Sequence, residues 1–222
     1  MLIIGHRGAR GLAPENTIAG LRKALEHTVD EIEFDVRVTK DAIPVLLHDA
    51  EASDVAGTKL VVRDTAYKTL KAHKPDLTTL AEAMEYVDTR TRLLIEVKPS
   101  EPVLPIVKVV TMFIENGAYA SEDLLLGSFS QQTLRELHEL MPEIEKVVIE
   151  RWSGVKASFR ARQVGTKRLS MKHLWLWGGF LKAMQRRGYK IAPYTVNDPS
   201  VIRKWRPYIY GVITDYPDRF EK

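Results

Sequence analysis

Short runs of β-branched and other apolar residues alternate with longer segments of helical periodicity along the whole chain. Eight such runs occur, beginning at residues 2, 31, 92, 124, 145, 167, 189 and 210. Between them, apolar residues recur every three or four positions in residues 15–27, 78–87, 102–117, 131–141 and 181–188. Strands that alternate with crossover helices form parallel sheets. Eight units therefore predict an α/β fold of the closed (β/α)8 TIM-barrel type rather than an open doubly wound sheet.

One segment interrupts this alternation. The stretch TKDAIPVLLHD, residues 39–49, indicates a turn and an extra short strand that ends at His48, and residues 49–76 show no clear period. We predict a small insertion after the second strand, over about residues 49–76, of the kind that commonly forms a lid or binding loop. With 222 residues, 45% of them hydrophobic, the chain can build one sizeable core, so we expect residues 1–222 to form a single catalytic domain.

The composition narrows the classes of site and partner. The chain has no cysteine, which excludes disulfides, thiolate nucleophiles and thiolate metal ligands. Its 33 basic and 29 acidic residues are spread over the whole sequence, so we expect a small-molecule substrate and no nucleic-acid partner. The first strand leads directly into a polar loop and no long apolar run follows, so we expect a cytoplasmic protein.

Charged residues alternate with apolar ones near the ends of two predicted strands. Glu33 and Asp35 in EIEFDV are two positions apart and point to one face of their strand, and Glu96 and Lys98 in LLIEVK repeat this spacing. Three converging carboxylates favour a hard divalent cation, Mg²⁺ or Ca²⁺. The alternative is a salt-bridge network of these carboxylates with Lys98 and Arg7. Because strand ends are where barrels build active sites, we favour the metal site.

Two histidines are predicted to face the same end of the barrel. His6 ends the first strand and His48 ends the extra strand, and imidazoles transfer protons near neutral pH. Arg7 and Lys98 add positive charge that suits a phosphate, although Arg7 taken alone could simply pair with Glu15 or Asp35. These groups together predict a site for a phosphate ester.

The motifs also resemble those of the glycerophosphodiester phosphodiesterase family. HRGARGLAPENT is similar to the His-Arg-Gly and Pro-Glu-Asn-Thr opening of that family, and EFDVRVTKDAIPVLLHD is similar to its Glu-x-Asp and His-Asp block. LLIEVK, SFS, YTVND and GVITDYPD extend the match in order to residue 218. The resemblance implies a phosphodiesterase barrel with a divalent cation.

The resemblance also implies roles for single residues. Glu33, Asp35 and Glu96 correspond to metal ligands, His6 and His48 to acid/base residues, and Arg7 and Lys98 to phosphate-binding residues. In the family, a glycerol hydroxyl attacks its own phosphorus and expels the alcohol, and water then opens the cyclic phosphate. The expected products are glycerol 3-phosphate and an alcohol.

Substrate choice is the part of this prediction that the sequence leaves open. Tyr194 stands where the family usually has tryptophan, so we expect it to form a smaller aromatic wall beside the substrate. One alternative function is a lysophospholipase D-type reaction on lysophospholipids. Another is a catalytically idle barrel that only binds phosphorylated ligands, but the candidate histidines and carboxylates are all present.

An aromatic cluster follows the sixth predicted strand. Trp175, Trp177 and Phe180 could receive an acyl chain or touch a bilayer at the catalytic end of the barrel. We favour the interpretation that they pack the sixth helix onto the barrel. The basic run from Lys156 to Arg168 is likewise interpreted as a solvated helix face, so contact with a membrane surface is not favoured.

Overall fold

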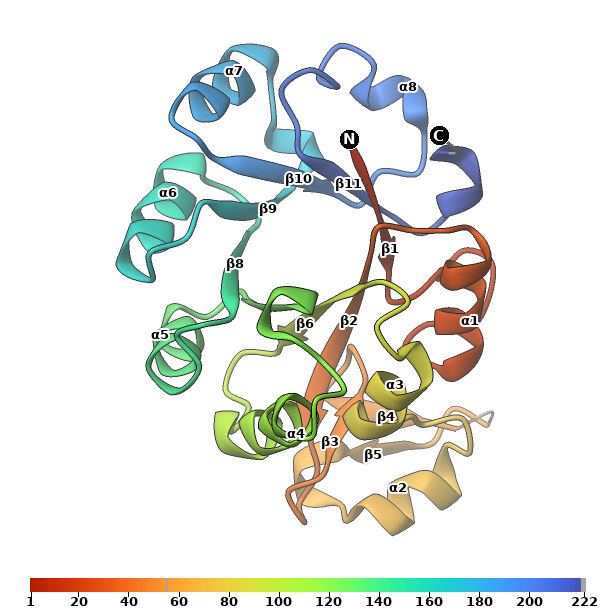
Figure 1. Ribbon diagram of the computed structural model, residues 1–222. Helices are drawn as coiled ribbons and strands as arrows, with labels where there is room; N and C mark the ends of the chain where they lie inside the picture. Colours follow the sequence, from red (N-terminus) through yellow and green to blue (C-terminus); the bar gives the residue numbers. More distant parts are fainter. Residues whose placement is uncertain (55, 221–222) are drawn as a thin grey trace.

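Eight parallel strands form a barrel at the centre of the computed structural model, which describes residues 1–54 and 56–220 (Figure 1). Val55 of the predicted insertion and the last two positions of the predicted 1–222 domain lie outside the described residues. The barrel strands are β1 (Leu2–His6), β2 (Glu31–Val38), β6 (Arg92–Val97), β7 (Leu124–Ser128), β8 (Glu145–Glu150), β9 (Arg168–Lys172), β10 (Lys190–Tyr194) and β11 (Gly211–Thr214). Each coincides with one of the eight predicted runs, and the predicted TIM-barrel fold is confirmed.

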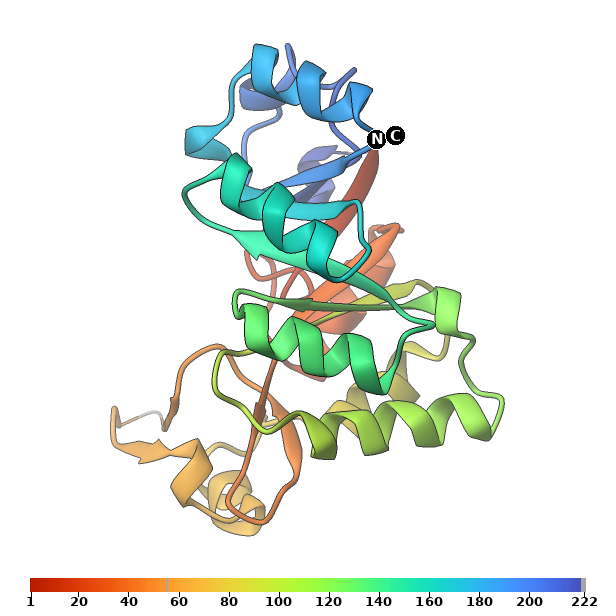
Figure 2. The same cartoon turned by 90° about the vertical axis from the view of Figure 1, so that its left-hand side faces the viewer.

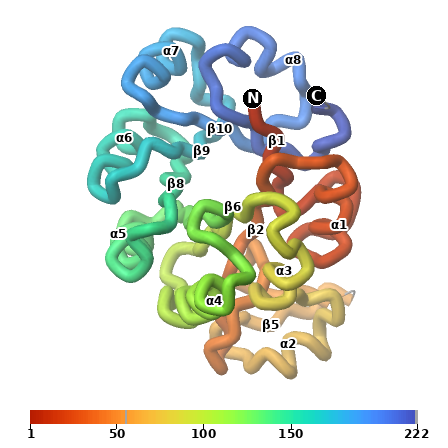
Figure 3. Tube along the Cα trace, viewed as in Figure 1, coloured from red at the N-terminus to blue at the C-terminus, as the bar shows by residue number. Residues whose placement is uncertain are grey.

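The strands follow one another around the barrel in sequence order, as the trace in Figure 3 makes visible. Parallel ladders join the neighbouring strands from β11 through β1, β2, β6, β7, β8 and β9 to β10. Two backbone hydrogen bonds connect the remaining seam between β10 and β11. The amide of Tyr210 donates to the carbonyl of Ile191 at 2.8 Å, and the amide of Val196 donates to that of Ile213 at 3.0 Å.

Helices cover the outside of the barrel and return the chain to the start of the next strand. They are α1 (Ile18–Glu26), α3 (Leu80–Val87), α4 (Val103–Glu115), α5 (Gln131–Leu140), α6 (Gly154–Gln163), α7 (Gly178–Arg186) and the short α8 (Pro199–Ile202). Polar side chains fix several of their starts; Thr79, for example, forms a reciprocal capping box with Glu82 before α3. Among the described residues, no helix is long and apolar enough to cross a bilayer.

The predicted insertion is present, and it has more regular structure than its sequence suggested. The strand β3 (Pro44–Leu46) pairs antiparallel with β2. It is followed by the hairpin β4 (Glu51–Ser53) and β5 (Lys59–Val61), the 3-10 turn η1 (Val62–Asp64) and the helix α2 (Tyr67–His73). Figure 2 shows this segment at one side of the barrel. His48 lies two residues beyond β3, not at its end as expected.

The insertion has a small core of its own, separate from the main core. Val45, Ala52, Val62, Leu70 and Leu77 are all buried in it. The first four lie on elements of three to seven residues, and Leu77 lies in the loop between α2 and α3. Elements this short contain too few repeats to reveal a period, which is why residues 49–76 show no helical or strand pattern in the sequence.

The basic run from Lys156 to Arg168 is not a uniformly solvated face. Lys156 and Arg162 are exposed on α6, as expected, but Arg160 and Arg168 are buried. The guanidinium of Arg160 binds the carboxylate of Glu150, and that of Arg168 binds Glu31 inside the barrel wall. The interpretation was therefore wrong for these two arginines, because buried carboxylates elsewhere in the chain provide their partners.

The prediction that Trp175 and Trp177 pack the following helix onto the barrel is also wrong. Their exposed fractions are 54% and 65%, whereas Leu176 between them is buried. The chain forms a 3-10 turn, η3 (His173–Trp175), after β9, and α7 begins only at Gly178. Leu176 and the α7 residue Leu181 fill the core there, so only Phe180 of the predicted cluster packs against it.

Candidate active site

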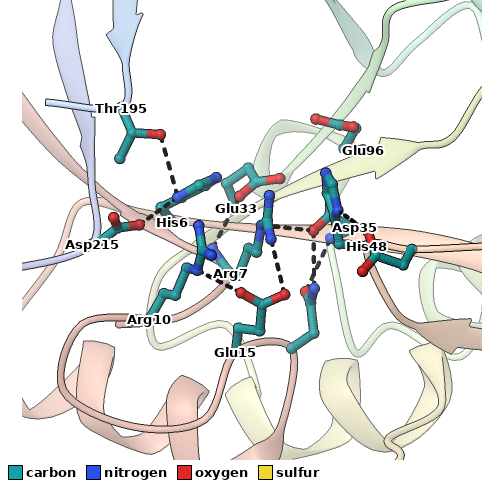
Figure 4. A network of polar contacts seen from close by, with 12 residues as sticks. His6, Arg7, Arg10, Glu15, Glu33, Asp35, His48, Glu96, Thr195 and Asp215 are labelled. Carbon is teal, nitrogen blue, oxygen red and sulfur yellow. Dashed lines mark hydrogen bonds and ion pairs between the residues drawn. The ribbon is translucent and has the colours of Figure 1, made fainter. Parts of the chain in front are cut away.

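A pocket opens at the carboxyl ends of the barrel strands, where TIM barrels place their functional groups. It brings together all eight residues predicted for the site: His6, Arg7, Glu33, Asp35, His48, Glu96, Lys98 and Tyr194. They come from β1, β2, β6, β10 and the loops that follow β1, β3 and β6. Figure 4 shows His6 at one side of the carboxylates and His48 at the other.

The loop after β1 turns sharply because of its backbone conformation. Arg7 and Gly8 have φ angles of 52° and 88°, in the left-handed region. A Cβ atom on Gly8 would lie 2.5 Å from the carbonyl carbon of Gly20, so only glycine allows α1 to approach this turn. The turn directs the backbone N–H of Arg7 at the carboxylate of Glu33, to which it donates at 3.0 Å.

Three buried carboxylates meet at the floor of the pocket. One oxygen from each of Glu33, Asp35 and Glu96 lies within 4.8 Å of the others. Glu33 and Asp35 share one face of β2, and Asp35 pairs in register with Glu96 on β6. The predicted alternation is confirmed, since Phe34 and Val97 point outward into the core beneath the helices.

Two cations accompany the carboxylates, and both contact Asp35. The Nζ atom of Lys98 lies 2.5 Å from Oδ1 of Asp35 and also contacts Glu96. The Nε atom of Arg7 lies 3.1 Å from Oδ2 of Asp35, and its Nη1 lies 2.8 Å from Oε1 of Glu15. The ion pairs considered for Arg7 therefore both form, while its side chain also lines the pocket.

The three carboxyl groups have different pKa values, because the neighbouring charges and the degree of compensation differ among them. Burial alone would raise the pKa of Asp35, but Lys98 and Arg7 lower it to about 2. Burial and the negative charge of Asp35 raise the pKa of Glu96 to about 7 and that of Glu33 well above its ordinary value. Glu33 takes part in no ion pair with the residues that the structure describes, so its charge is the least compensated.

This donor set fits a hard divalent cation. It offers oxygen atoms alone, buried, close together and with more negative charge than Lys98 and Arg7 neutralise. Mg²⁺ and Ca²⁺ take carboxylate oxygens and leave further positions for water or ligand oxygens. A buried carboxylate such as Glu33 otherwise keeps its proton, because isolated buried charge is costly.

His6 is held from behind by a carboxylate that the sequence analysis assigned no role. Its Nδ1 atom lies 2.6 Å from Oδ1 of Asp215, just beyond β11. Asn197 donates to the other oxygen of Asp215 at 2.8 Å and accepts from its backbone N–H. Since the carboxylate accepts, the hydrogen of His6 resides on Nδ1, and Nε2 is the ring nitrogen left for a ligand. Hydrogen bonds from His6 and Asn197 outweigh burial and lower the pKa of Asp215.

His48 is held in a similar way, but in a more open position. Its Nδ1 atom lies 2.7 Å from Oδ1 of Asp49, and its backbone carbonyl accepts two hydrogen bonds from Arg37. Arg37 is in turn paired with Glu101 at 2.7 Å. Burial and the nearby charge of Lys98 lower the pKa of His48, which favours its neutral form.

Asn16 is a second residue that the sequence analysis did not single out. Its Nδ2 atom donates to Oδ2 of Asp35 at 2.9 Å, and its Oδ1 accepts from the backbone N–H of Asp35 at 3.1 Å. The asparagine of PENT and the aspartate of GVITDYPD both belong to motifs that resemble those of the phosphodiesterase family. Those motifs were the only available signal for Asn16 and Asp215, because no spacing rule connects either residue to its partner.

Tyr194 forms part of the pocket wall. Its ring meets that of Phe129 edge to face, with centroids 6.2 Å apart, and its hydroxyl donates to the carbonyl of Glu150 at 3.3 Å. Burial raises the pKa of Tyr194, so the hydroxyl stays protonated. Arg151 lines the same wall, with its guanidinium 5.6 Å from the ring of Phe129.

Comparisons with known proteins agree over almost the whole chain. Residues 6–219 match the model of the glycerophosphoryl diester phosphodiesterase family. A glycerophosphodiester phosphodiesterase of Bacillus altitudinis is 28% identical over 99% of this chain and 96% of its own length. The crystal structure of the Thermotoga maritima enzyme is 26% identical with a TM-score of 0.82, covering 99% of this chain and 97% of that one.

A further solved structure is that of an Oleispira antarctica phosphodiesterase in complex with the product sn-glycerol-3-phosphate. It superposes with a TM-score of 0.85 at 24% identity, covering 99% of this chain and 94% of that one. The barrel and its strand order are thus shared with proteins whose sequences differ at about three quarters of the aligned positions.

Proposed function

The chain belongs to the glycerophosphoryl diester phosphodiesterase family, and we propose that it uses a divalent cation and two histidines to hydrolyse glycerophosphodiesters to glycerol 3-phosphate and an alcohol. The observation that carries this proposal is the arrangement of one pocket. Three carboxylates lie on its floor, and two imidazoles, each bound to a carboxylate through Nδ1, flank them. The proposal extends to residues 1–222 acting as one catalytic domain.

Glu33, Asp35 and Glu96 would hold the cation. When bound, Mg²⁺ or Ca²⁺ neutralises charge on the phosphate and polarises its oxygens. Asn16 keeps the carboxylate of Asp35 in place by binding both its side chain and its backbone. Lys98 and Arg7 already face the cluster, and we assign them to the non-bridging phosphate oxygens, where fixed positive charge opposes the charge that develops during attack.

His6 and His48 would divide the proton transfers. One imidazole removes the proton from the attacking hydroxyl of the glycerol unit, and the other protonates the departing alkoxide. The new bond joins that hydroxyl oxygen to phosphorus, the bond to the alcohol oxygen breaks, and water then opens the cyclic phosphate. Asp215 and Asp49 keep the Nδ1 atoms occupied, so each ring presents Nε2. Tyr194 borders the substrate as part of the pocket wall.

A product assay tests this proposal directly. Glycerol 3-phosphate is measured after incubation with glycerophosphocholine, first with the untreated protein, then with a chelator, and then with Mg²⁺ or Ca²⁺ added back. We expect the chelator to abolish product formation and one of the two ions to restore it. Full activity in the metal-stripped protein would refute the cation, and the absence of product under every condition would refute the substrate.

Lysophospholipids are the second candidate substrates. The observation that favours them is the exposure of Trp175 and Trp177 near the catalytic end of the barrel, where apolar surface could accompany an acyl chain. The same assay with lysophosphatidylcholine measures this activity, because the expected phosphorylated product then carries the acyl chain and the released alcohol is choline.

A further inference from the structure

Five large apolar side chains are exposed together on two adjacent loops of the barrel. We call them the apolar rim: Trp152, Val155, Leu174, Trp175 and Trp177, with exposed fractions of 54% to 81%. The first two lie on the β8–α6 connection and the start of α6, and the others lie between β9 and α7. The rings of Trp152 and Trp175 are in contact, with centroids 5.4 Å apart, so exposed aromatic side chains of the two loops meet.

Buried contacts hold the rim in this exposed position. Glu150 accepts hydrogen bonds from the backbone N–H groups of Arg151 and Trp152, and its other oxygen binds Arg160 at 3.2 Å. In the second loop, Leu176 is buried and fixes the chain between Trp175 and Trp177. Large exposed apolar patches on folded domains commonly mark interaction sites.

The rim is continuous with the mouth of the active-site pocket. Arg151, which precedes Trp152, lines that pocket. In Figure 1, α6 and α7 lie on the side of the barrel away from the insertion, which carries α2 and the β4–β5 hairpin. The rim therefore borders one side of the pocket mouth, and the insertion lies on the other side.

The charge of the surrounding segment is strongly one-sided. Residues 151–197 contain eleven Lys and Arg residues and no Asp or Glu. Two of the eleven, Arg160 and Arg168, are buried and paired with Glu150 and Glu31, which leaves nine for the surface of this segment. Lys156 lies on α6 and Lys182 on α7, while Lys172 ends β9 and lies 5.9 Å from the ring of Trp152. The next acidic residue, Asp198, caps α8 through Ser200.

We propose that the apolar rim docks this end of the barrel onto the surface of an anionic lipid bilayer. Tryptophan side chains are enriched at the boundary between headgroups and acyl chains, and nearby Lys and Arg residues are attracted to anionic headgroups. Exposed tryptophans in a segment that carries Lys and Arg but no Asp or Glu match both features of that boundary. Docking requires no catalysis, so this proposal stands or falls independently of the proposed function.

In this orientation, the pocket mouth opens toward the headgroup layer. If the proposed function holds, a phosphodiester that is anchored in the bilayer by an acyl chain reaches the site without leaving the membrane. A water-soluble diester gains nothing from docking. The rim would thus select between lipid and soluble substrates of the same chemistry.

Vesicle binding tests the proposal without reference to activity. Three of the four tryptophans belong to the rim, and the fourth, Trp205, packs against the barrel core. Quenching of tryptophan fluorescence by brominated lipids therefore reports directly on the rim. We expect quenching with vesicles of equal parts phosphatidylglycerol and phosphatidylcholine, and binding at least roughly tenfold weaker for Trp175→Ala/Trp177→Ala.

Two matched variants control for this effect. Met112→Ser/Leu140→Ser removes exposed apolar side chains from α4 and α5, away from the rim, and should bind like the unmodified protein. His6→Ala should also bind normally, because the imidazole is not part of the rim. Circular dichroism establishes that each variant is folded.

A second pair of variants tests whether the basic residues near the rim contribute to vesicle binding. Lys156→Glu/Lys182→Glu should weaken binding to the anionic vesicles roughly tenfold or more, and added salt should weaken the binding of the unmodified protein. Arg186→Glu/Arg187→Glu changes the net charge equally at the far end of α7 and should have a much smaller effect.

Two results would overturn the proposal. The first is an absence of binding to the anionic vesicles, and the second is equal binding by the Trp175→Ala/Trp177→Ala variant. If vesicle binding is absent and the protein self-associates in sedimentation experiments in a way that depends on the rim tryptophans, the rim belongs to an interface with a second copy of this chain.

Discussion

The Nδ1 atom of His6 lies 2.6 Å from Oδ1 of Asp215, although 209 positions separate the two residues in the sequence. Strands β1 and β11 are hydrogen-bonded neighbours in the barrel, and Gly5 pairs in register with Thr214, so closure of the barrel creates this contact. Asp215 itself does not line the pocket, so we expect it to affect the reaction only by positioning the imidazole of His6.

Asp215→Asn should lower kcat for glycerophosphocholine by about 10- to 10³-fold, because an amide can bind the other ring tautomer and does not stabilise a charged imidazole. The KM should change little, since phosphate contacts are retained. The variant should also show the same dependence on the leaving group as His6→Ala. Unfolding measured by circular dichroism serves as the control. If kcat falls but the leaving-group dependence of Asp215→Asn differs from that of His6→Ala, Asp215 has a purely structural role.

His6 and His48 should respond differently to the acidity of the leaving group. Each proton transfer contributes roughly 10²- to 10⁴-fold to the rate. A diester that releases p-nitrophenol needs little protonation of its leaving group, so it should largely rescue the variant that lacks the general acid. The variant that lacks the base should stay impaired. Measurement of kcat/KM for His6→Ala and His48→Ala on both substrate types decides which is which, and near-normal rates for both would contradict the acid/base assignment.

Cation binding should strengthen as the pH rises, because a cation competes with a proton bound at Glu96. In the metal-free protein, burial and Asp35 raise the pKa of Glu96 from 4.5 to about 7, so the native state binds more protons than the unfolded state between these values. The free energy of unfolding contributed by this group is therefore largest below about pH 4.5 and falls as the pH rises through 7.

A cation competes with that proton and should restore the lost stability. The increase in Tm caused by Mg²⁺ or Ca²⁺ should be larger at about pH 8 than at about pH 6, because the ligands must be deprotonated to bind. Differential scanning calorimetry of Glu96→Gln is the matched comparison, and its ion-induced shift should be smaller and flatter with pH. A larger ion-induced shift at the lower pH would contradict this coupling.

The pair of Glu31 and Arg168 should contribute to stability rather than to activity. Glu31 is fully buried, Arg168 is 2% exposed, and their atoms lie 2.8 Å apart at the start of the barrel strands. Among the described residues, Arg168→Met leaves the buried Glu31 carboxylate with Arg92 as its one ion-pair partner, and it should lower the free energy of unfolding by about 3–5 kcal/mol.

Replacement of both partners should cost less than the sum of the single changes. Glu31→Leu/Arg168→Met removes the buried charge that each single variant leaves without its shortest ion pair. Urea unfolding of the two single variants and the double variant measures this difference. Strictly additive losses would show that the two side chains do not depend on each other.

The local pattern of the sequence determined the barrel and the floor of its site. Alternating strand and helix periods predicted all eight barrel strands, because each period reflects which face of an element is buried. The two-residue spacing of Glu33 and Asp35 placed both carboxylates inward, since successive side chains of a strand point to opposite faces. These are properties of neighbouring residues, and they can be read without knowledge of the fold.

The tertiary structure alone decided which distant residues complete the site and which side chains stay exposed. Asp215 reaches His6 only because the last strand closes against the first. Arg168 is buried because Glu31 faces it across the barrel, and Trp175 is exposed because Leu176 already fills the core beside it. Burial and pairing depend on which distant residues lie opposite a side chain in space. The residues next to it in the sequence do not specify those partners.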